Sequence, residues 1–266
     1  MANNGKLSGK RALVTGSGTG LGRETALEFA RQGADVAVHY NHSARGAESA
    51  VQAIQAMGRR AAMLQANLER PAACLQMVEA AISFLGGLDI LVNNAGIVEA
   101  KSFLEVTPEY YDLVYNVNVR GQFFCAQRAA QQMLQQESKG VIINITSIHG
   151  CSGFPGCSVY DGTKGAIWAW TRELAVELGP LGIRVNGVAP GWIVVERVFE
   201  QHADFDPVAA GKHTVPWKRL GRPIDVAKAC VYLASEDSDY VVGQVMIVDG
   251  GVTARTALRL ATLDAD

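Results

Sequence analysis

Two residues that could move a proton together stand four positions apart, at the ends of the segment Tyr160-Asp161-Gly162-Thr163-Lys164. Residues four apart lie on one face of a helix, so the phenol and the ammonium could act on one ligand. A tyrosine in water titrates at about pH 10, and it shuttles protons at neutral pH only where positive charge stabilises its phenolate. The pair therefore predicts acid–base chemistry. The alternative is an ordinary helix that carries a solvated lysine.

A glycine-rich turn near the N-terminus could hold the phosphates of a nucleotide. It covers residues 15–22, directly after the first predicted strand, and it leads into a predicted helix. Backbone that passes close to a pyrophosphate must lack side chains, and a helix N-terminus supplies free N–H groups and a positive dipole. The sequence therefore predicts a dinucleotide site, the alternative being a tight turn without ligand. The spacing Gly-x-x-x-Gly-x-Gly differs from the Gly-x-Gly-x-x-Gly fingerprint of two-domain dehydrogenases.

Taken in order along the chain, these motifs resemble those of the short-chain dehydrogenase/reductase family. The resemblance runs from the glycine turn through Asn93-Asn94-Ala95-Gly96 to Asp249-Gly250-Gly251, and so covers nearly the whole chain. Four further positions match the family's catalytic residues one by one, namely Asn118, Ser147, Tyr160 and Lys164. From the residues alone, Ser147 could equally be a turn or cap serine and Asn118 a polar residue at a helix kink.

The resemblance implies a role for each of the four. Tyr160 gives or takes the hydroxyl proton, and Ser147 hydrogen-bonds the substrate oxygen. Lys164 lowers the pKa of Tyr160 and binds the nicotinamide ribose, while Asn118 holds a water that connects Lys164 to solvent. The expected reaction is hydride transfer between NAD(P) and a secondary alcohol or ketone. The resemblance also implies a set of cofactor contacts, from Gly16, Ser17, Thr19, Gly20, Leu21, Gly22, Tyr40, Asn41, His42, Asn67, Leu68, Asn94, Ala95, Gly96, Tyr160, Lys164, Pro190, Gly191 and Ile193.

The sequence departs from the family's pattern at positions that concern the cofactor. Tyr40 stands where members that prefer NAD usually carry an acidic residue, which favours NADP(H). Thr19 instead argues against NADP(H), since many NADP-preferring relatives have a basic residue at this position. Arg23 could take the place of that basic residue. Asn67 stands where an Asp is usual, and its amide can still hydrogen-bond adenine. Val195 replaces a Thr whose hydroxyl binds the carboxamide, so nicotinamide anchoring is either looser or supplied by neighbouring backbone.

Short apolar runs alternate with longer amphipathic segments, and this rhythm predicts βαβ units around one parallel sheet. Several runs are apolar nearly throughout, as in strands that helices cover on both faces. The fold class is therefore α/β, a Rossmann-type doubly wound sheet of about seven strands. We expect strands at 11–15, 35–40, 60–65, 88–93, 140–146, 183–189 and 244–248. We expect helices near 20–32, 44–57, 71–86, 108–136, 159–179 and 224–235.

No long polar or repetitive linker interrupts the alternation, so residues 1–266 are predicted to form one domain, with 192–222 as a loop-and-helix lid. The net charge of −2 offers no basic field for nucleic acid. The five cysteines lack the Cys-x-x-Cys pairs of a zinc or redox site, so we expect no bound metal. A signal peptide and a membrane helix of roughly 18 apolar residues are both missing from the sequence, which favours a cytoplasmic protein.

The substrate is the least determined part of the prediction. Overall similarity favours a sugar or polyol first, and a 3-oxoacyl-carrier-protein or other small ketone second. Candidate pocket residues, each of which could instead be structural, are His149, Cys151, Phe154, Cys157 and Trp192. By analogy with the family we expect a homotetramer. Two other functions stay open: a regulatory protein that binds NAD(P) without turnover, and epimerisation or dehydration through a transient ketone.

Overall fold

A computed structural model describes residues 5–136 and 138–255 and contains one seven-stranded parallel sheet. The strand order is β3-β2-β1-β4-β5-β6-β7. Every predicted strand is present, with bounds within about two residues of those expected. The strands are β1 (Arg11–Val14), β2 (Asp35–Tyr40), β3 (Ala61–Gln65), β4 (Ile90–Asn93), β5 (Val141–Ile145), β6 (Arg184–Pro190) and β7 (Val245–Val248).

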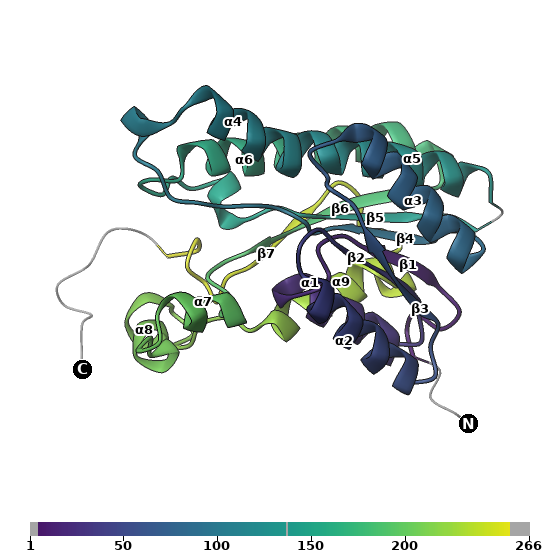
Figure 1. Ribbon diagram of the computed structural model, residues 1–266, viewed down its shortest axis with the longest axis horizontal. Helices are drawn as coiled ribbons and strands as arrows, with labels where there is room; N and C mark the ends of the chain where they lie inside the picture. The colour runs from purple at the N-terminus through teal and green to yellow at the C-terminus, as the bar shows by residue number, and fades with distance from the viewer. Residues whose placement is uncertain (1–4, 137, 256–266) are drawn as a thin grey trace.

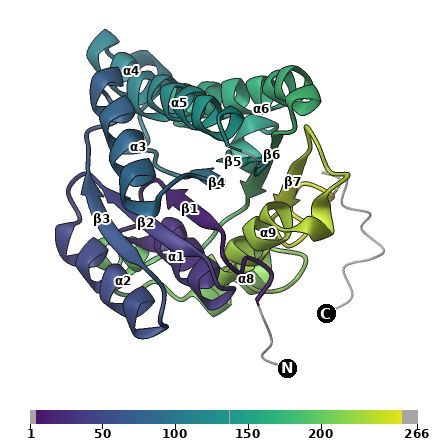
Figure 2. The same cartoon turned by 90° about the vertical axis from the view of Figure 1, so that its right-hand side faces the viewer.

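Helices cover both faces of the sheet, which confirms the doubly wound arrangement (Figures 1 and 2). One face carries α3 (Pro71–Leu85), α4 (Pro108–Tyr115), α5 (Gln122–Leu134) and α6 (Ser158–Leu178). The other face carries α1 (Gly20–Arg31), α2 (Ala44–Ala56) and α9 (Pro223–Ala234). Two short helices, α7 (Glu196–Gln201) and α8 (Pro207–Thr214), stand away from the sheet inside the segment expected as a lid (Figure 1).

The strands have apolar residues on consecutive positions because each face packs against its own helix layer. Along β1, Leu13 joins the core under α3 and α5, whereas Val14 joins the core under α1 and α9. Phe29 of α1 and Met77 of α3 are buried members of the two cores. The polar ends of the strands are thereby held at fixed positions along one edge of a rigid sheet. Within the described residues, no helix has the length and apolar character needed to cross a lipid bilayer.

The single helix expected over 108–136 is interrupted, which corrects the sequence prediction. The chain leaves α4 at Tyr115, passes through a π-helical turn over Asn116–Gly121, and continues as α5. A π-turn inserts extra residues into the helical spiral, so side-chain directions change there although the apolar pattern continues. This turn buries Asn118 completely, and periodicity could not reveal it because each half alone is an ordinary amphipathic helix.

The strand order creates a crevice at the carboxyl ends of β1 and β4. The chain winds from β1 outward to β3, then crosses back so that β4 pairs with β1 on its other side. Connections that leave in opposite directions from neighbouring strands open a gap at this point, where α/β folds bind ligands. The glycine turn follows β1, the Asn94–Gly96 loop follows β4, and Ser147 lies just after β5. One edge of the sheet thus collects the residues with predicted chemistry.

Candidate active site

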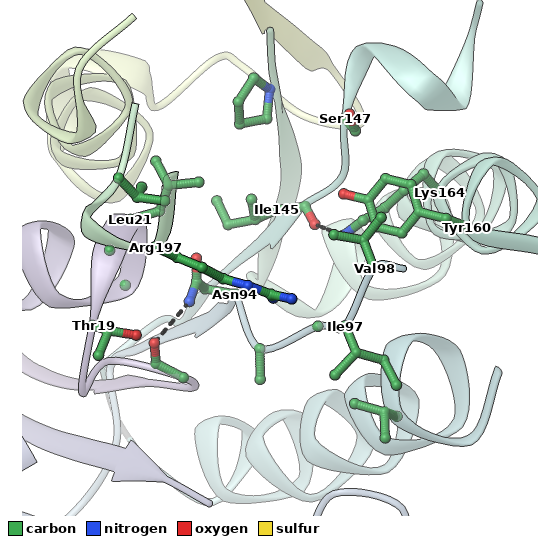
Figure 3. Close-up of a pocket in the computed structure, with 18 of the residues that line it drawn as sticks. Thr19, Leu21, Asn94, Ile97, Val98, Ile145, Ser147, Tyr160, Lys164 and Arg197 are labelled. Carbon is green, nitrogen blue, oxygen red and sulfur yellow. Dashed lines mark hydrogen bonds between the residues drawn. The ribbon is translucent and has the colours of Figure 1, made fainter. Parts of the chain in front are cut away.

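A cleft of about 1210 Å³ opens at this edge and is bordered by the ends of six strands, β1 to β6, and by the lid segment. Figure 3 shows Thr19 and Leu21 of the glycine turn on one side, and Ser147, Tyr160 and Lys164 on the other. Eighteen of the nineteen predicted cofactor residues line it, Ser17 being the exception. They are Gly16, Thr19, Gly20, Leu21, Gly22, Tyr40, Asn41, His42, Asn67, Leu68, Asn94, Ala95, Gly96, Tyr160, Lys164, Pro190, Gly191 and Ile193.

The glycine turn has the close packing that a phosphate cradle requires. Gly16 has a φ of +65°, which glycine adopts without strain. A Cβ on Gly22 would lie 2.3 Å from the Gly16 carbonyl oxygen and 2.4 Å from Asn94 Nδ2, so no side chain fits there. Helix α1 begins at Gly20, and its ladder of hydrogen bonds starts with Arg23 N–H donating to Thr19 O. The N–H groups before Arg23 therefore remain available to an anion at the cleft.

Neighbouring elements hold the glycine turn in place. Asn94 Nδ2 donates to the carbonyl oxygens of Thr15 (2.8 Å) and Gly16 (3.2 Å), and so ties the turn to the end of β4. Ser17 is buried; its hydroxyl donates to Val14 O and accepts from His39 N–H. Ser17 therefore supports the turn from behind, and its side chain does not face the cleft.

A buried histidine that sequence reasoning missed also supports the turn. His39 Nδ1 accepts a hydrogen bond from Gly16 N–H at 2.9 Å, and Nε2 lies 3.1 Å from Ala66 O. A carbonyl oxygen only accepts, so Nε2 carries the proton and the ring is neutral. Burial lowers the pKa of His39. The available signal was a histidine in an otherwise apolar strand end, where a hydrogen-bonding partner is required.

The predicted phenol and ammonium do lie together on one face of α6. Lys164 Nζ is 5.4 Å from the centroid of the Tyr160 ring, and it donates a hydrogen bond of 2.8 Å to Ile145 O (Figure 3). Thr146 Oγ1 in turn donates to Lys164 O at 2.8 Å, which fixes the start of α6 against β5. These contacts bring a phenol, an ammonium and the Ser147 hydroxyl to one wall of the cleft.

Burial dominates the pKa of Tyr160 in the protein without cofactor. Burial raises it to about 12, while a hydrogen bond with Ser147 acts in the opposite direction. Burial also lowers the pKa of Lys164 to about 8. In the protein without cofactor desolvation disfavours the phenolate, and Cys157 and Asp161 disfavour it further. The lowering of the phenol pKa expected from Lys164 beside an oxidised nicotinamide stays a prediction.

Asn118 lies beside Gly96, which is also close to Lys164, but Asn118 does not line the cleft. Its Oδ1 accepts from Ile97 N–H at 2.8 Å, and its Nδ2 donates to Ile97 O at 2.9 Å and to Thr163 Oγ1 at 3.2 Å. A Cβ on Gly96 would lie 3.2 Å from Asn118 Oδ1 and 3.8 Å from Lys164 Nζ. Asn118 therefore joins the β4 loop to α6, and the predicted water relay stays a prediction.

Comparisons with known proteins find relatives that match this chain over nearly its whole length. The family model described as Enoyl-(Acyl carrier protein) reductase matches residues 16–253. The 3-oxoacyl-acyl-carrier-protein reductase FabG of Staphylococcus epidermidis is 39% identical, over 91% of this chain and 98% of its own length. L-rhamnose 1-dehydrogenase (NAD(P)(+)) of a Sphingomonas species is 37% identical, over 92% of this chain and 97% of its own. A short chain dehydrogenase from Burkholderia cenocepacia, solved in complex with NADP, superposes with a TM-score of 0.86 at 36% identity, over 93% of this chain and 99% of that one.

The chain belongs to the short-chain dehydrogenase/reductase family.

Membership confirms the predicted class of function as well as the fold. Like other short-chain dehydrogenases/reductases, the protein is an NAD(P)-dependent oxidoreductase that acts on CH–OH and C=O groups. Its substrate is a small molecule, as expected. The regulatory alternative without turnover predicts damage to the set Asn118, Ser147, Tyr160 and Lys164, and all four residues are present. The relatives that support enzyme function are named as reductases and dehydrogenases.

Several cleft residues of this short-chain dehydrogenase/reductase were not predicted as cofactor contacts. Arg197 extends from α7 across the cleft towards Asn94 (Figure 3), two residues beyond the unusual Val195. Glu69 lines the cleft next to Asn67, whose Oδ1 accepts from Glu69 N–H at 3.0 Å. The sequence did offer a signal for Arg197, because this charged residue lies two positions after Val195, where the family's threonine hydroxyl is missing. Sequence reasoning had no comparable signal for Glu69.

The candidate substrate residues divide into two groups. His149, Phe154 and Trp192 line the cleft, whereas Cys151 and Cys157 do not. Cys151 is exposed and Cys157 is half-buried, and neither forms a disulfide. The polar group of His149 and the aromatic surfaces of Phe154 and Trp192 therefore remain as the side chains that can meet a substrate.

Proposed function

We propose that this protein oxidises a secondary alcohol of a sugar or polyol, or reduces the corresponding ketone, with NADP(H) as the preferred cofactor. The observation that carries the proposal is the single cleft in which the glycine turn faces Ser147, Tyr160 and Lys164 (Figure 3). The free N–H groups at the start of α1 fit a pyrophosphate, and the tight packing at Gly22 holds the turn in the shape that presents them. The bound nicotinamide supplies or accepts the hydride.

Each catalytic side chain has a task that follows from its chemistry. The substrate hydroxyl lies between Ser147 and Tyr160, where the serine hydroxyl orients it and the phenol oxygen takes its proton. In the opposite direction Tyr160 returns a proton to the carbonyl oxygen. Lys164 contributes positive charge beside the phenol, which partly offsets the burial that raises the Tyr160 pKa. Its hydrogen bond to Ile145 O holds the ammonium in that position.

The preference for NADP(H) rests on the residues after β2. Tyr40, Asn41, His42 and Ser43 line this end of the cleft and bring no carboxylate that would repel a 2′-phosphate. Arg45, just beyond them, is exposed at the start of α2 and can turn towards an anion. Steady-state KM values for NADP⁺ and NAD⁺ with one substrate test this preference. A lower KM for NAD⁺ contradicts it.

Reduction of a 3-oxoacyl thioester or other small ketone is the second candidate. The 39% identity to the Staphylococcus epidermidis reductase favours it. The apolar part of the cleft, with Val98, Leu113 and Trp192, could accept an acyl chain. Saturation kinetics with a 3-oxoacyl thioester, compared with those of a sugar panel, discriminate between the two candidates.

Two further expectations belong to this proposal. Residues 192–222, with α7 and α8, act as the lid, and Arg197 of this segment, which lines the cleft, would hold the pyrophosphate of the cofactor. The protein forms a homotetramer, and one contact covers the apolar surface of the edge strand β7 and the end of α6, where Val176 is 78% exposed and Ile247 is 41% exposed. Light scattering of the wild type and of Val176→Glu tests the assembly, since a charge in an apolar contact should yield smaller species. The cytoplasmic location stays a prediction.

The deciding experiment is a screen for nicotinamide absorbance change over sugars, polyols, secondary alcohols and ketones with both cofactors. A stoichiometric change identifies a dehydrogenase, whereas an epimerase regenerates its cofactor and gives none. Lys164→Ala should weaken both cofactor binding and turnover, but Tyr160→Phe should spare binding. Equal losses of cofactor affinity in both variants contradict the roles assigned here.

A further inference from the structure

The cleft contains a polar pair that the acid–base scheme above does not use. His149 Nδ1 lies 2.6 Å from Asp161 Oδ1, a short hydrogen bond between two side chains that are 21% and 19% exposed. The second carboxylate oxygen of Asp161 accepts from Phe154 N–H at 3.1 Å. Both oxygens of the carboxylate are therefore engaged, and the pair is shielded from bulk water yet open to a ligand in the cleft.

The contact with Asp161 determines which nitrogen of the His149 imidazole carries the proton. An ionised carboxylate only accepts hydrogen bonds, so the Nδ1 atom that faces Asp161 must carry a proton. A neutral imidazole with its proton on Nδ1 presents Nε2 as a hydrogen-bond acceptor. Asp161 thus sets the tautomer of His149, and Nε2 on the opposite side of the imidazole can accept a hydrogen bond from a hydroxyl group.

Three contacts fix the orientation of the imidazole. The ring stacks on Phe154, with centroids 3.8 Å apart and planes at 17°. The backbone N–H of His149 donates to Ser147 Oγ at 3.2 Å, so His149 shares one loop with a catalytic residue. The ring centroid lies 5.3 Å from that of Tyr160. Because His149 lines the cleft and Asp161 does not, the imidazole stands between the carboxylate and the substrate space.

A metal ion is the competing occupant of this cluster. His149, Cys157 and Asp161 place possible ligand atoms within 4.8 Å of one another. Two ligands of a tetrahedral zinc at about 2.0 Å would lie roughly 3.3 Å apart. The 2.6 Å between His149 Nδ1 and Asp161 Oδ1 is shorter than this and fits a shared proton. The geometry therefore favours the hydrogen-bonded pair.

We propose that His149, oriented by Asp161, binds a hydroxyl group on the carbon next to the reacting carbon. The enzyme would then select vicinal diols and α-hydroxy ketones over simple alcohols and ketones. The reacting oxygen occupies the position between Ser147 and Tyr160, and the second oxygen lies at Nε2 of the neighbouring imidazole. His149 is thus a specificity-determining residue and Asp161 a positioning residue. This inference rests on the sugar or polyol function proposed above.

The test compares pairs of substrates that differ by one hydroxyl group, such as acetoin with butanone, and sugars with their deoxy counterparts. The readout is the ratio of kcat/KM values within each pair. We expect the wild type to favour the hydroxylated member by about tenfold or more, as for a hydrogen bond to a neutral partner. His149→Phe keeps the aromatic stack on Phe154 and should reduce the ratio by about tenfold. Tyr240→Phe, which changes a fully exposed aromatic residue outside the cleft and outside the lid segment, is the control.

Asp161 is tested through rescue by a conservative variant. Asp161→Ala should reduce the ratio in the same direction as His149→Phe. Asp161→Asn keeps an oxygen that accepts from Nδ1–H and should restore most of the ratio. An equal loss on both members of each pair in His149→Phe, or no rescue by asparagine, overturns the inference.

The remaining outcomes separate this inference from the proposals around it. Turnover with an unchanged ratio in His149→Phe refutes the inference but leaves the dehydrogenase function intact. Turnover of no pair with either cofactor refutes the sugar or polyol function proposed above and, with it, this inference. Activity that a chelator removes and Zn²⁺ restores assigns His149, Cys157 and Asp161 to a metal site instead.

Discussion

Replacing Lys164 by methionine should stabilise the ligand-free protein although it should abolish turnover. Lys164 is 3% exposed, and burial lowers its pKa from 10.5 to about 8. The folded state therefore holds an ammonium that water would solvate better. The difference between the two pKa values corresponds to about 3 kcal/mol. Methionine has a similar length and no charge, so it removes this cost.

The net effect also includes a lost hydrogen bond. Lys164 Nζ donates to Ile145 O at 2.8 Å, and leaving that carbonyl without this partner costs about 1 kcal/mol. The free energy of unfolding should thus rise by about 2 kcal/mol at pH 7. Below pH 8 the ammonium is charged in both states and the folded protein bears the full cost. Between pH 8 and 10.5 the unfolded state binds more protons, so wild-type stability rises with pH.

Urea unfolding without cofactor at pH 7 and pH 10 measures both effects. The advantage of Lys164→Met at pH 7 should have largely vanished at pH 10, because the wild type regains most of the cost of the buried ammonium over this interval. Lys212→Met, which removes an exposed lysine of α8, should change stability by less than about 0.5 kcal/mol at either pH. A variant less stable than the wild type at pH 7, or a difference that does not depend on pH, would refute the reasoning.

Three further predictions concern the walls of the cleft. Gly22→Ala should weaken NADP⁺ binding at least tenfold and destabilise the fold by about 1–3 kcal/mol, because the added Cβ would lie 2.3 Å from Gly16 O. Isothermal titration and urea unfolding measure the two effects. Gly153→Ala is the control, because a Cβ at Gly153 meets no atom within 4 Å. His39→Gln should flatten the loss of thermal stability below about pH 6.5, since burial lowers the pKa of His39 and the unfolded state then takes up the proton first; an unchanged acid slope contradicts this. Arg197→Met should weaken NADP⁺ binding about tenfold at low salt and reduce its salt dependence, as intrinsic fluorescence titration would report; equal salt slopes would remove Arg197 from the pyrophosphate site.

The fold was readable from the sequence because its signals are local. Strands covered on both faces must be apolar over consecutive residues, so the run that forms β5 indicated its own burial and parallel pairing. The glycine turn was equally local, since strand, turn and helix start within residues 11–22. The four-residue spacing of Tyr160 and Lys164 fixed their common face, because a helix has a constant rotation per residue.

What required the tertiary structure involves groups that meet from distant parts of the chain. The π-turn at Asn118 and the bonds of that side chain to Ile97 depend on how this segment packs against α6 and the loop after β4, and periodicity does not encode them. The Tyr160 pKa depends on burial, which raises it to about 12 where the Tyr160–Lys164 spacing suggested a lowered value. The contact of His149 with Asp161 joins the loop after β5 to the first turn of α6. Sequence determined which chemical groups this protein has, whereas desolvation and long-range packing decided which of them act together.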